Sequence, residues 1–296
     1  MPKPILVDSH VHLYSADEDR YRPSAGCLRP PSGTGSLERL RHLCRKTGVS
    51  RVCAIQTATF YGFDNRYVCD VSKANPDWIA GICMIDPENP DGPQLLKELV
   101  LEHGVRGLRS RPSADGQLDR ASVRRLWAAA ADLGIVVNIL ASRENADGVD
   151  NLLREFPTVP AVLEHSLCLN LSTDRVATLR ELARLSRHEN VNVELCDLPV
   201  LSCERYPFPD MHNTYLKIID MYGPERSLWG SCFPLELWMP EITYGENQRI
   251  FQQEIAIDAQ ARAAILGETA NRLWFRGIKE QSSGIGQEDG DVSRSD

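Results

Sequence analysis

The segment Ile5-Leu6-Val7-Asp8-Ser9-His10-Val11-His12 decides how the rest of this chain is interpreted. Its apolar residues predict a short buried β-strand over residues 5–8, with polar residues at the carboxyl end of the strand. Because side chains alternate between the faces of a strand, we expect His10 and His12 on one face. Two neutral imidazoles placed in this way can bind one divalent cation. A hydrogen-bonded polar pair at a strand end is the alternative.

Similar strand-like runs recur along the chain, and amphipathic helical segments separate them. The runs are Arg51–Gln56, Trp78–Ile85, Val105–Arg109, Ile135–Leu140, Pro160–His165, Val191–Leu195 and Ser227–Ser231. Strands that alternate with helices imply parallel βαβ units. With the first strand, they predict an α/β fold, a closed (β/α)8 TIM barrel, which typically has about 250 residues. An open doubly wound sheet would need a Gly-rich phosphate turn after the first strand, and the sequence has none.

Composition predicts one domain and excludes several classes of partner. The chain has 296 residues, 42% of them hydrophobic, and a formal net charge of −8. We expect one barrel domain over residues 1–277, with a Pro- and Gly-rich loop at 15–36 that is either a lid or surface decoration. The polar segment 278–296 is expected to be disordered. The negative charge disfavours nucleic acid and anionic membranes as partners.

The expected compartment is the cytoplasm. No signal peptide is recognisable, and no apolar stretch approaches the ~20 residues of a membrane span. The nine cysteines form no Cys-x-x-Cys pair and are expected to be reduced thiols. Cys196 lies in a strand-like run, where a thiol usually behaves as a small buried hydrophobe.

A third histidine is expected at the same end of the barrel. His165 follows the strand-like run Ala161-Val162-Leu163-Glu164, so it would face the mouth that His10 and His12 face. Catalytic zinc typically has three protein ligands and one open position for water. Zinc bound in this way lowers the pKa of its water to roughly 7. We therefore expect His10, His12 and His165 to bind a divalent metal, with zinc the first choice and a metal-free protein the alternative.

Several motifs, taken together, resemble the amidohydrolase-related enzymes. They are Val7–Tyr14, Gly104–Arg109, Leu163–His165, Val191–Leu195, Leu228–Ser231 and Ile265–Leu273. The resemblance spans nearly residues 5–275 and implies a TIM barrel whose members are, or once were, metal-dependent. The family includes lactone hydrolases that act on sugar-acid and pyrone-dicarboxylate lactones. It also includes decarboxylases of aromatic or muconate-type acids.

The strand-eight motif departs from the family pattern. The family reads Gly-Ser-Asp-x-Pro there, whereas this chain reads Gly230-Ser231-Cys232-Phe233-Pro234. Cys232 could bind metal as a thiolate, or act as a nucleophile or acid–base group, or mark a pocket that has lost hydrolysis. Glu194 stands where relatives often carry lysine. If Glu194 faces the mouth, it supplies an acid or base, and if it faces outward it is a solvated surface residue.

The resemblance also suggests how a substrate is bound. Lactone-hydrolase relatives use arginines in this region to hold acid groups, and here Arg109 is the first candidate and Arg106 the second. Gln56, Tyr61 and Asn138 are candidate polar lining of the pocket.

The expected function is a hydrolase that opens a lactone of a small carboxylate-bearing substrate by attack of activated water. His165, Cys232 and Glu194 would be the catalytic groups. A non-oxidative decarboxylase is the runner-up, although decarboxylase relatives often carry a further histidine on the next strand and Val191–Leu195 offers none. A metal-independent or repurposed member remains the third alternative. The sequence is compatible with a homo-oligomer.

Overall fold

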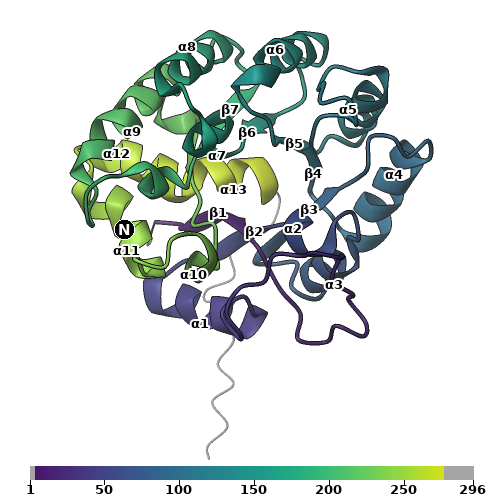
Figure 1. Cartoon of the computed structure of the whole chain (residues 1–296), viewed down its shortest axis with the longest axis horizontal. Coiled ribbons are helices and arrows are strands. Elements are labelled where there is room, and N and C mark those ends of the chain that lie inside the picture. Colours follow the sequence, from purple (N-terminus) through teal and green to yellow (C-terminus); the bar gives the residue numbers. More distant parts are fainter. Residues whose placement is uncertain (1–3, 277–296) are drawn as a thin grey trace, which may run out of the picture.

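Eight parallel strands form one barrel in the computed structural model, which describes residues 4–276. The strands are β1 (Val7–Val11), β2 (Arg51–Ile55), β3 (Ile79–Met84), β4 (Gly107–Ser110), β5 (Val136–Ile139), β6 (Ala161–Leu163), β7 (Val191–Leu195) and β8 (Ser227–Trp229). Each strand pairs with the next in sequence order (Figure 1). The residues after β8 return to β1, where the His12 amide donates to the Phe233 carbonyl oxygen at 2.8 Å. The predicted (β/α)8 barrel is confirmed.

Helices cover the outside of the barrel (Figure 1). The longer ones are α1 (Leu37–Thr47), α3 (Arg66–Ala74), α4 (Gly92–His103), α5 (Ala121–Leu133), α6 (Ala146–Glu155), α8 (Arg175–Leu185) and α9 (Pro209–Tyr222). Shorter ones are α2 (Ala58–Tyr61), α7 (His165–Cys168), α10 (Leu235–Trp238), α11 (Tyr244–Arg249), α12 (Ala259–Ala263) and α13 (Thr269–Trp274). Gly104 and Gly134 end α4 and α5 in the left-handed conformation, which glycine adopts without a steric penalty.

Both histidine-bearing strands differ from their predicted boundaries. β1 begins at Val7 and extends to Val11, so His10 lies inside the strand. Its pairing register with β2 shifts between Asp8 and Val11, which marks a bulge that interrupts strict alternation. β6 ends at Leu163, two residues before His165, because the chain turns into the left-handed region at His165.

Apolar side chains close one end of the barrel. An inner cluster fills the lumen, and Trp274 and Phe275 of the final helical segment belong to it. Its other buried members are Val7, Cys53, Ile55, Ala80, Ile82, Val136, Val162, Leu228 and Ala270. A larger cluster fills the layer between the strands and the helices. The amino ends of the strands therefore form a packed base, and polar side chains collect at the opposite end.

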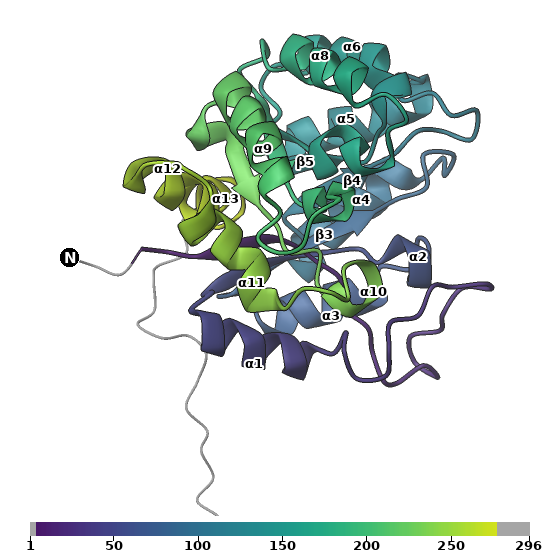
Figure 2. The same ribbon diagram turned by 60° about the vertical axis from the view of Figure 1, so that its left-hand side comes forward.

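The loop at residues 15–36 is fastened to the segment after β2. The Ser24 amide donates to the Phe60 carbonyl oxygen at 2.7 Å, and the Leu28 amide donates to the Thr59 carbonyl oxygen at 2.9 Å. Figure 2 shows this purple loop beside α2. Within residues 4–276, no helix is both long enough and apolar enough to cross a membrane. The polar segment predicted at 278–296 lies outside the described residues.

Candidate active site

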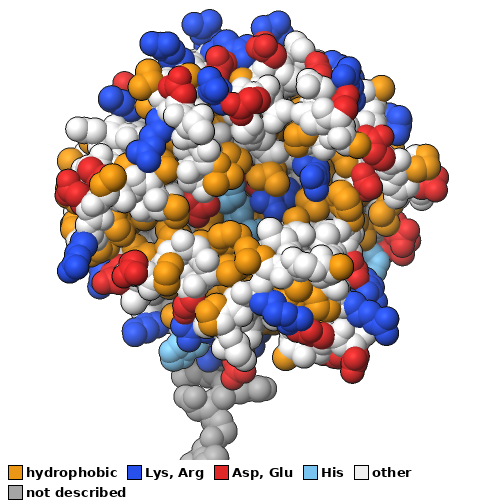
Figure 3. Space-filling model, viewed as in Figure 1, with side chains coloured by type: hydrophobic (Ala, Val, Ile, Leu, Met, Phe, Trp, Pro, Cys, Tyr) orange, Lys and Arg blue, Asp and Glu red, His pale blue; other side chains and the backbone are white. Residues whose placement is uncertain are grey.

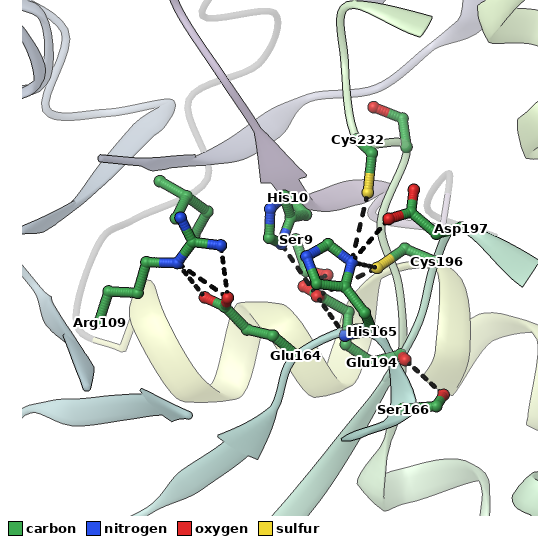
Figure 4. Close-up of polar contacts among 12 residues, drawn as sticks. Ser9, His10, Arg109, Glu164, His165, Ser166, Glu194, Cys196, Asp197 and Cys232 are labelled. Carbon is green, nitrogen blue, oxygen red and sulfur yellow. Dashed lines mark hydrogen bonds and ion pairs between the residues drawn. The ribbon is translucent and has the colours of Figure 1, made fainter. Parts of the chain in front are cut away.

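Buried polar side chains gather where β1, β6, β7 and β8 end (Figure 4). The group comprises Ser9, His10, His12, Glu164, His165, Glu194, Cys196, Asp197 and Cys232. Figure 3 looks onto the molecule as Figure 1 does. It shows histidine and basic atoms in a hollow at the centre of this face, with hydrophobic side chains around them. Burying a polar group without a hydrogen-bond or metal partner costs free energy, so each of these side chains is expected to have such a partner.

His10 and His12 direct one nitrogen each toward the other. The His12 Nδ1 atom lies 3.1 Å from the carbonyl oxygen of Ile55, which can only accept, so Nδ1 carries the hydrogen and Nε2 a lone pair. The His10 Nδ1 atom lies 2.9 Å from Glu194 Oε2. Burial lowers the pKa of His10 to about 3, and the neighbouring His165 adds to this effect, so the ring is neutral at neutral pH. Burial also lowers the pKa of His12 well below its ordinary value.

Glu194 accepts hydrogen bonds from several directions. Its Oε1 accepts from the Ser9 hydroxyl at 3.0 Å, and its Oε2 accepts from the Cys196 thiol at 3.2 Å. Burial raises the pKa of Glu194, whereas these donors and the nearby His165 oppose the rise. A carboxylate that receives this many donors acts as an acceptor for the N–H of His10. The side chain faces the lumen and is fully buried.

These hydrogen bonds leave two lone pairs facing each other. The Nε2 atoms of His10 and His12 lie 3.2 Å apart. Two lone pairs at that distance repel unless a cation lies between them. Nitrogen ligands of tetrahedral zinc, bound at 2.0–2.1 Å, are about 3.3 Å apart. Imidazoles that ligate metals usually donate their other N–H to a carboxylate or a carbonyl, as both rings do here. The donor set therefore fits the divalent metal that the sequence predicts.

His165 lies between the histidine pair and a group of sulfur and oxygen atoms (Figure 4). Its ring centroid is 4.7 Å from that of His10. Its Nδ1 lies 3.0 Å from Cys196 Sγ, 3.0 Å from Asp197 Oδ2 and 3.8 Å from Cys232 Sγ. Burial lowers the pKa of His165, but Asp197 and Cys232 outweigh it and raise the pKa well above its ordinary value.

Three groups of candidate ligand atoms lie within 4.8 Å of one another in the described part of the chain. The first is His10, His165, Glu194 and Cys196, and the second is His165, Asp197 and Cys232. The third, Glu98, Glu102 and His103, lies on the outer face of α4. His12 belongs to none of these groups. Among the three predicted histidine ligands, His10 is therefore the one that lies close to both of the others.

Backbone strain is concentrated around His165. Four consecutive residues, His165 to Cys168, have φ between 49° and 60°, and Asp197 and Cys232 have φ of 58° and 57°. Each left-handed residue other than glycine costs roughly 1–2 kcal/mol. Surrounding hydrogen bonds hold this conformation. In one of them the Ser166 hydroxyl donates to the Glu194 carbonyl oxygen at 2.8 Å. Strain of this kind typically persists at functional sites.

Arg109 lies beside the histidines in a buried ion pair with Glu164. Its Nε lies 2.8 Å and 3.1 Å from the two carboxylate oxygens, and its Nη2 lies 2.7 Å from Oε2. Its Nη1 donates to the Gln56 carbonyl oxygen at 3.3 Å. A guanidinium has five N–H groups, so one on each Nη has no partner among these bonds. Asn138 pairs with Arg109 in register, and its buried amide nitrogen and oxygen both lack a hydrogen-bond partner.

Three predicted pocket residues have other contacts. Arg106 precedes β4 and lies at the base, where its Nη2 donates to the Pro76 carbonyl oxygen at 2.7 Å and its guanidinium stacks on Phe275. It is therefore not part of this site, because β4 carries it to the opposite end of the barrel from Arg109. The Gln56 amide donates to the carbonyl oxygens of Gly62 and Asp64 and so fixes the loop after β2. The Tyr61 hydroxyl accepts from the Ser15 amide at 2.8 Å and anchors the loop after β1.

Sequence reasoning missed four members of the site. Ser9 reaches Glu194 because of the bulge in β1, which no residue pattern revealed. The prediction includes His165 but not Glu164, which directly precedes it. The sequence predicts that Cys196 behaves as a small buried hydrophobe, although it lies two residues after Glu194 and so on the same face of the chain. Asp197 is the next residue along the chain, and its side chain also lies at the mouth.

A groove lies among the segments that follow β7 and β8. It has a volume of about 790 Å³ and lies between the loop that follows Asp197 and the segment that follows Cys232. Phe208, Trp238 and Met239 supply much of its apolar wall. None of the polar site residues named above is among those that line this groove.

Comparison with known proteins supports one family. A model of the amidohydrolase family matches residues 7–276. No curated protein matches the sequence. Among solved structures, a Pseudomonas putida protein provisionally assigned as a 2-pyrone-4,6-dicarboxylic acid hydrolase is 22% identical, with a TM-score of 0.74 over 92% of this chain and 97% of that one.

Two further structures show the range of this fold. An amidohydrolase from Burkholderia multivorans with bound zinc is 19% identical, with a TM-score of 0.73 over 91% of this chain and 98% of that one. The 5-carboxyvanillate decarboxylase of Sphingomonas paucimobilis is 14% identical, with a TM-score of 0.64 over 92% of this chain and 99% of that one. At these identities the likeness establishes the fold alone.

Proposed function

The chain belongs to the amidohydrolase family, and from that premise we propose that it hydrolyses a lactone that carries a carboxylate group. Water attacks the ring carbonyl, the carbon–oxygen bond of the ring breaks, and the product is a hydroxy acid. The observation that carries the proposal is the convergence of His10 Nε2 and His12 Nε2 at 3.2 Å beside a buried arginine.

We infer that His10, His12 and His165 hold a divalent cation, with zinc the best match to nitrogen donors. A cation bound there supplies a Lewis acid for the carbonyl and lowers the pKa of bound water. Glu194 and the Ile55 carbonyl oxygen fix the rings of His10 and His12, and Asp197 fixes the ring of His165. Glu194 therefore acts as a positioning residue for His10, since its oxygens are already occupied by donors.

Arg109 binds the substrate carboxylate in this proposal. Its two N–H groups without partners can form charge-assisted hydrogen bonds, and Glu164 holds the guanidinium in place. The orphaned amide of Asn138, next to Arg109 in register, offers a further donor and acceptor. These groups orient the ring so that its carbonyl faces the histidines.

Cys232 is the candidate proton donor to the leaving ring oxygen. Its side chain contacts His165, and the thiol occupies the position where the family carries an aspartate. A proton is needed there, because the departing alkoxide is a poor leaving group without one. Asp197 and His165 contact the same thiol and are placed to return the proton.

A paired substrate panel tests the proposal. We expect acid release from lactones that carry a ring carboxylate and at least ~10-fold slower turnover of the same lactones without it, since one charged hydrogen bond contributes about 1.5–3 kcal/mol. A chelator should abolish the activity and zinc should restore it. Release of carbon dioxide from aromatic acids, with no turnover of any lactone, would replace this proposal with a decarboxylase.

A further inference from the structure

Three side chains from β7 and β8 surround the Nδ1 atom of His165. Cys196 Sγ and Asp197 Oδ2 each lie 3.0 Å from this nitrogen, and Cys232 Sγ lies 3.8 Å from it. The two thiols also contact each other, and the Asp197 carboxylate contacts the Cys232 thiol. The four groups thus meet around one point on the side of the ring that faces away from His10 (Figure 4).

This arrangement exceeds what a hydrogen-bond network needs. One imidazole nitrogen carries at most one hydrogen, so it can donate to only one of its three neighbours. A catalytic triad would place the nucleophile and the carboxylate on different ring nitrogens, whereas Cys232 and Asp197 share Nδ1. The second carboxylate oxygen of Asp197, Oδ1, is buried and has no hydrogen-bond partner. Four side chains that can each bind a metal ion therefore converge on one point, and one oxygen of Asp197 has no other partner. Such a convergence is typical of the ligands of a metal ion.

The backbone fixes three of these four residues in place. His165, Asp197 and Cys232 all adopt left-handed φ angles, of 52°, 58° and 57°. Each angle redirects the side chain away from the course that a regular strand end would give it. Since β6, β7 and β8 each contribute, the cluster depends on the barrel rather than on one loop.

We propose that His165 Nδ1, Cys196, Asp197 and Cys232 form a sulfur-rich site for a soft divalent cation, which shares His165 with the proposed catalytic cation but uses neither His10 nor His12. Two sulfurs, one imidazole and one carboxylate favour zinc or cadmium over magnesium or manganese. On binding, each thiol releases its proton as a sulfur–metal bond forms, and the protonated His165 ring releases the hydrogen of Nδ1 as a nitrogen–metal bond forms; these protons go to solvent and nothing is oxidised. This site goes beyond the proposed hydrolysis. Because its occupation removes the proton of Cys232, a soft cation there inhibits the reaction.

Cadmium titration of the full-length protein, kept reduced and dialysed against a chelator, tests the site. We expect a cadmium–thiolate absorption band in the ultraviolet that saturates at one cation for this site and survives His12→Gln. Each of Cys196→Ser and Cys232→Ser should remove about half of the band, and the double variant should remove all of it, since each thiolate contributes separately. Cys203→Ser, at an exposed cysteine, is the matched control and should leave the band intact.

A second measurement needs no variant and so does not depend on folding of the substituted proteins. Calorimetric titration of the wild type in buffers of different ionisation enthalpy counts the protons released. We expect about three for each cadmium bound at this site, two from the thiols and one from the His165 ring. No thiolate band, a band that survives the double variant, or release of no protons would each overturn the site. Lactone turnover is scored independently, so loss of the band with turnover retained leaves the proposed function standing.

Discussion

Arg106 and Arg109 lie three residues apart and occupy opposite ends of the barrel. Arg106 lies at the base, where it donates to backbone carbonyl oxygens and stacks on Phe275. Arg109 lies at the mouth, nearly fully buried against Glu164 and beside the histidines. The base is stabilised by apolar packing, which needs no strained backbone. The mouth buries charges and holds six left-handed residues other than glycine around His165, a kind of strain that typically persists at functional sites.

The largest effect is expected from breaking the ion pair at the mouth. Glu164→Ala leaves the Arg109 guanidinium buried without its carboxylate, which should lower the free energy of unfolding by about 3–5 kcal/mol. Urea denaturation measures the loss. The control is Glu18→Ala, which removes the exposed ion pair with Arg29 and should change stability by less than ~1 kcal/mol. Equal losses of unfolding free energy in the two variants would mean that the buried ion pair at the mouth contributes no more to stability than an exposed one.

Two glycines, one at each end of the barrel, allow effects on stability to be distinguished from effects on turnover. A Cβ on Gly267, at the base, would lie 1.9 Å from the Ile5 carbonyl oxygen, and a Cβ on Gly230, at the mouth, would lie 2.8 Å from His10 Cβ. Gly230→Ala should lower the free energy of unfolding by about 1–3 kcal/mol, and Gly267→Ala by more, because its Cβ overlaps backbone atoms that cannot move aside. Only Gly230→Ala should also lower lactone turnover, by roughly 100-fold, because it displaces His10.

Turnover is measured per folded molecule, after correction by circular dichroism. If Gly267→Ala reduces turnover as much as Gly230→Ala does, the two ends do not differ in function and the comparison fails.

Removing the acceptor behind His10 should weaken metal binding without removing a ligand of the pair. Glu194→Gln keeps the size of the side chain but loses the charge that fixes His10 Nδ1. Partners of this kind typically contribute 10–100-fold to metal affinity, so zinc competition with a chelator should show a loss of that size. Glu189→Gln, at an exposed position, is the matched control. An unchanged zinc affinity in Glu194→Gln would remove Glu194 from the site.

The smallest effect is expected in the helix layer, in the ion pairs between α6 and the end of α8. Burial raises the pKa of Asp150, but His188, Arg154 and Arg184 outweigh this effect and hold the pKa below the ordinary value. A depressed folded pKa gives stability that is present above about pH 4 and is lost as the pH falls through the folded pKa. Asp150→Asn should therefore cost roughly 0.5–1 kcal/mol at pH 7 and less at pH 2. Urea denaturation at the two pH values checks this, and a larger cost at pH 2 would contradict it.

The fold was predictable because its signal is spread over the whole chain. Each of the eight strands corresponds to a strand-like run that the sequence shows, and the alternation of these runs with helical segments predicts parallel βαβ units. The expectation for Arg106 failed because position along the strand, which residue type does not reveal, decides which end an arginine reaches.

The site was predictable only where residue type was enough. His10, His12 and His165 are predicted to bind metal from their residue type and strand-end positions, and the structure brings His10 close to each of the other two. Cys196 and Asp197 did not, since their approach to His165 depends on left-handed backbone at residues 165 and 197. Ser9 depended on a bulge in β1. Such local departures from regular geometry arise from the packed barrel and leave no periodic pattern in the sequence.

The central claim is that the mouth holds a cation between two imidazoles whose other nitrogens are already fixed. Anomalous scattering from a crystal grown with zinc tests this directly. We predict a zinc peak about 2.0–2.1 Å from both His10 Nε2 and His12 Nε2, with His12 Nδ1 still bonded to the Ile55 carbonyl oxygen. A crystal saturated with zinc that shows no peak between these two nitrogens would contradict the account.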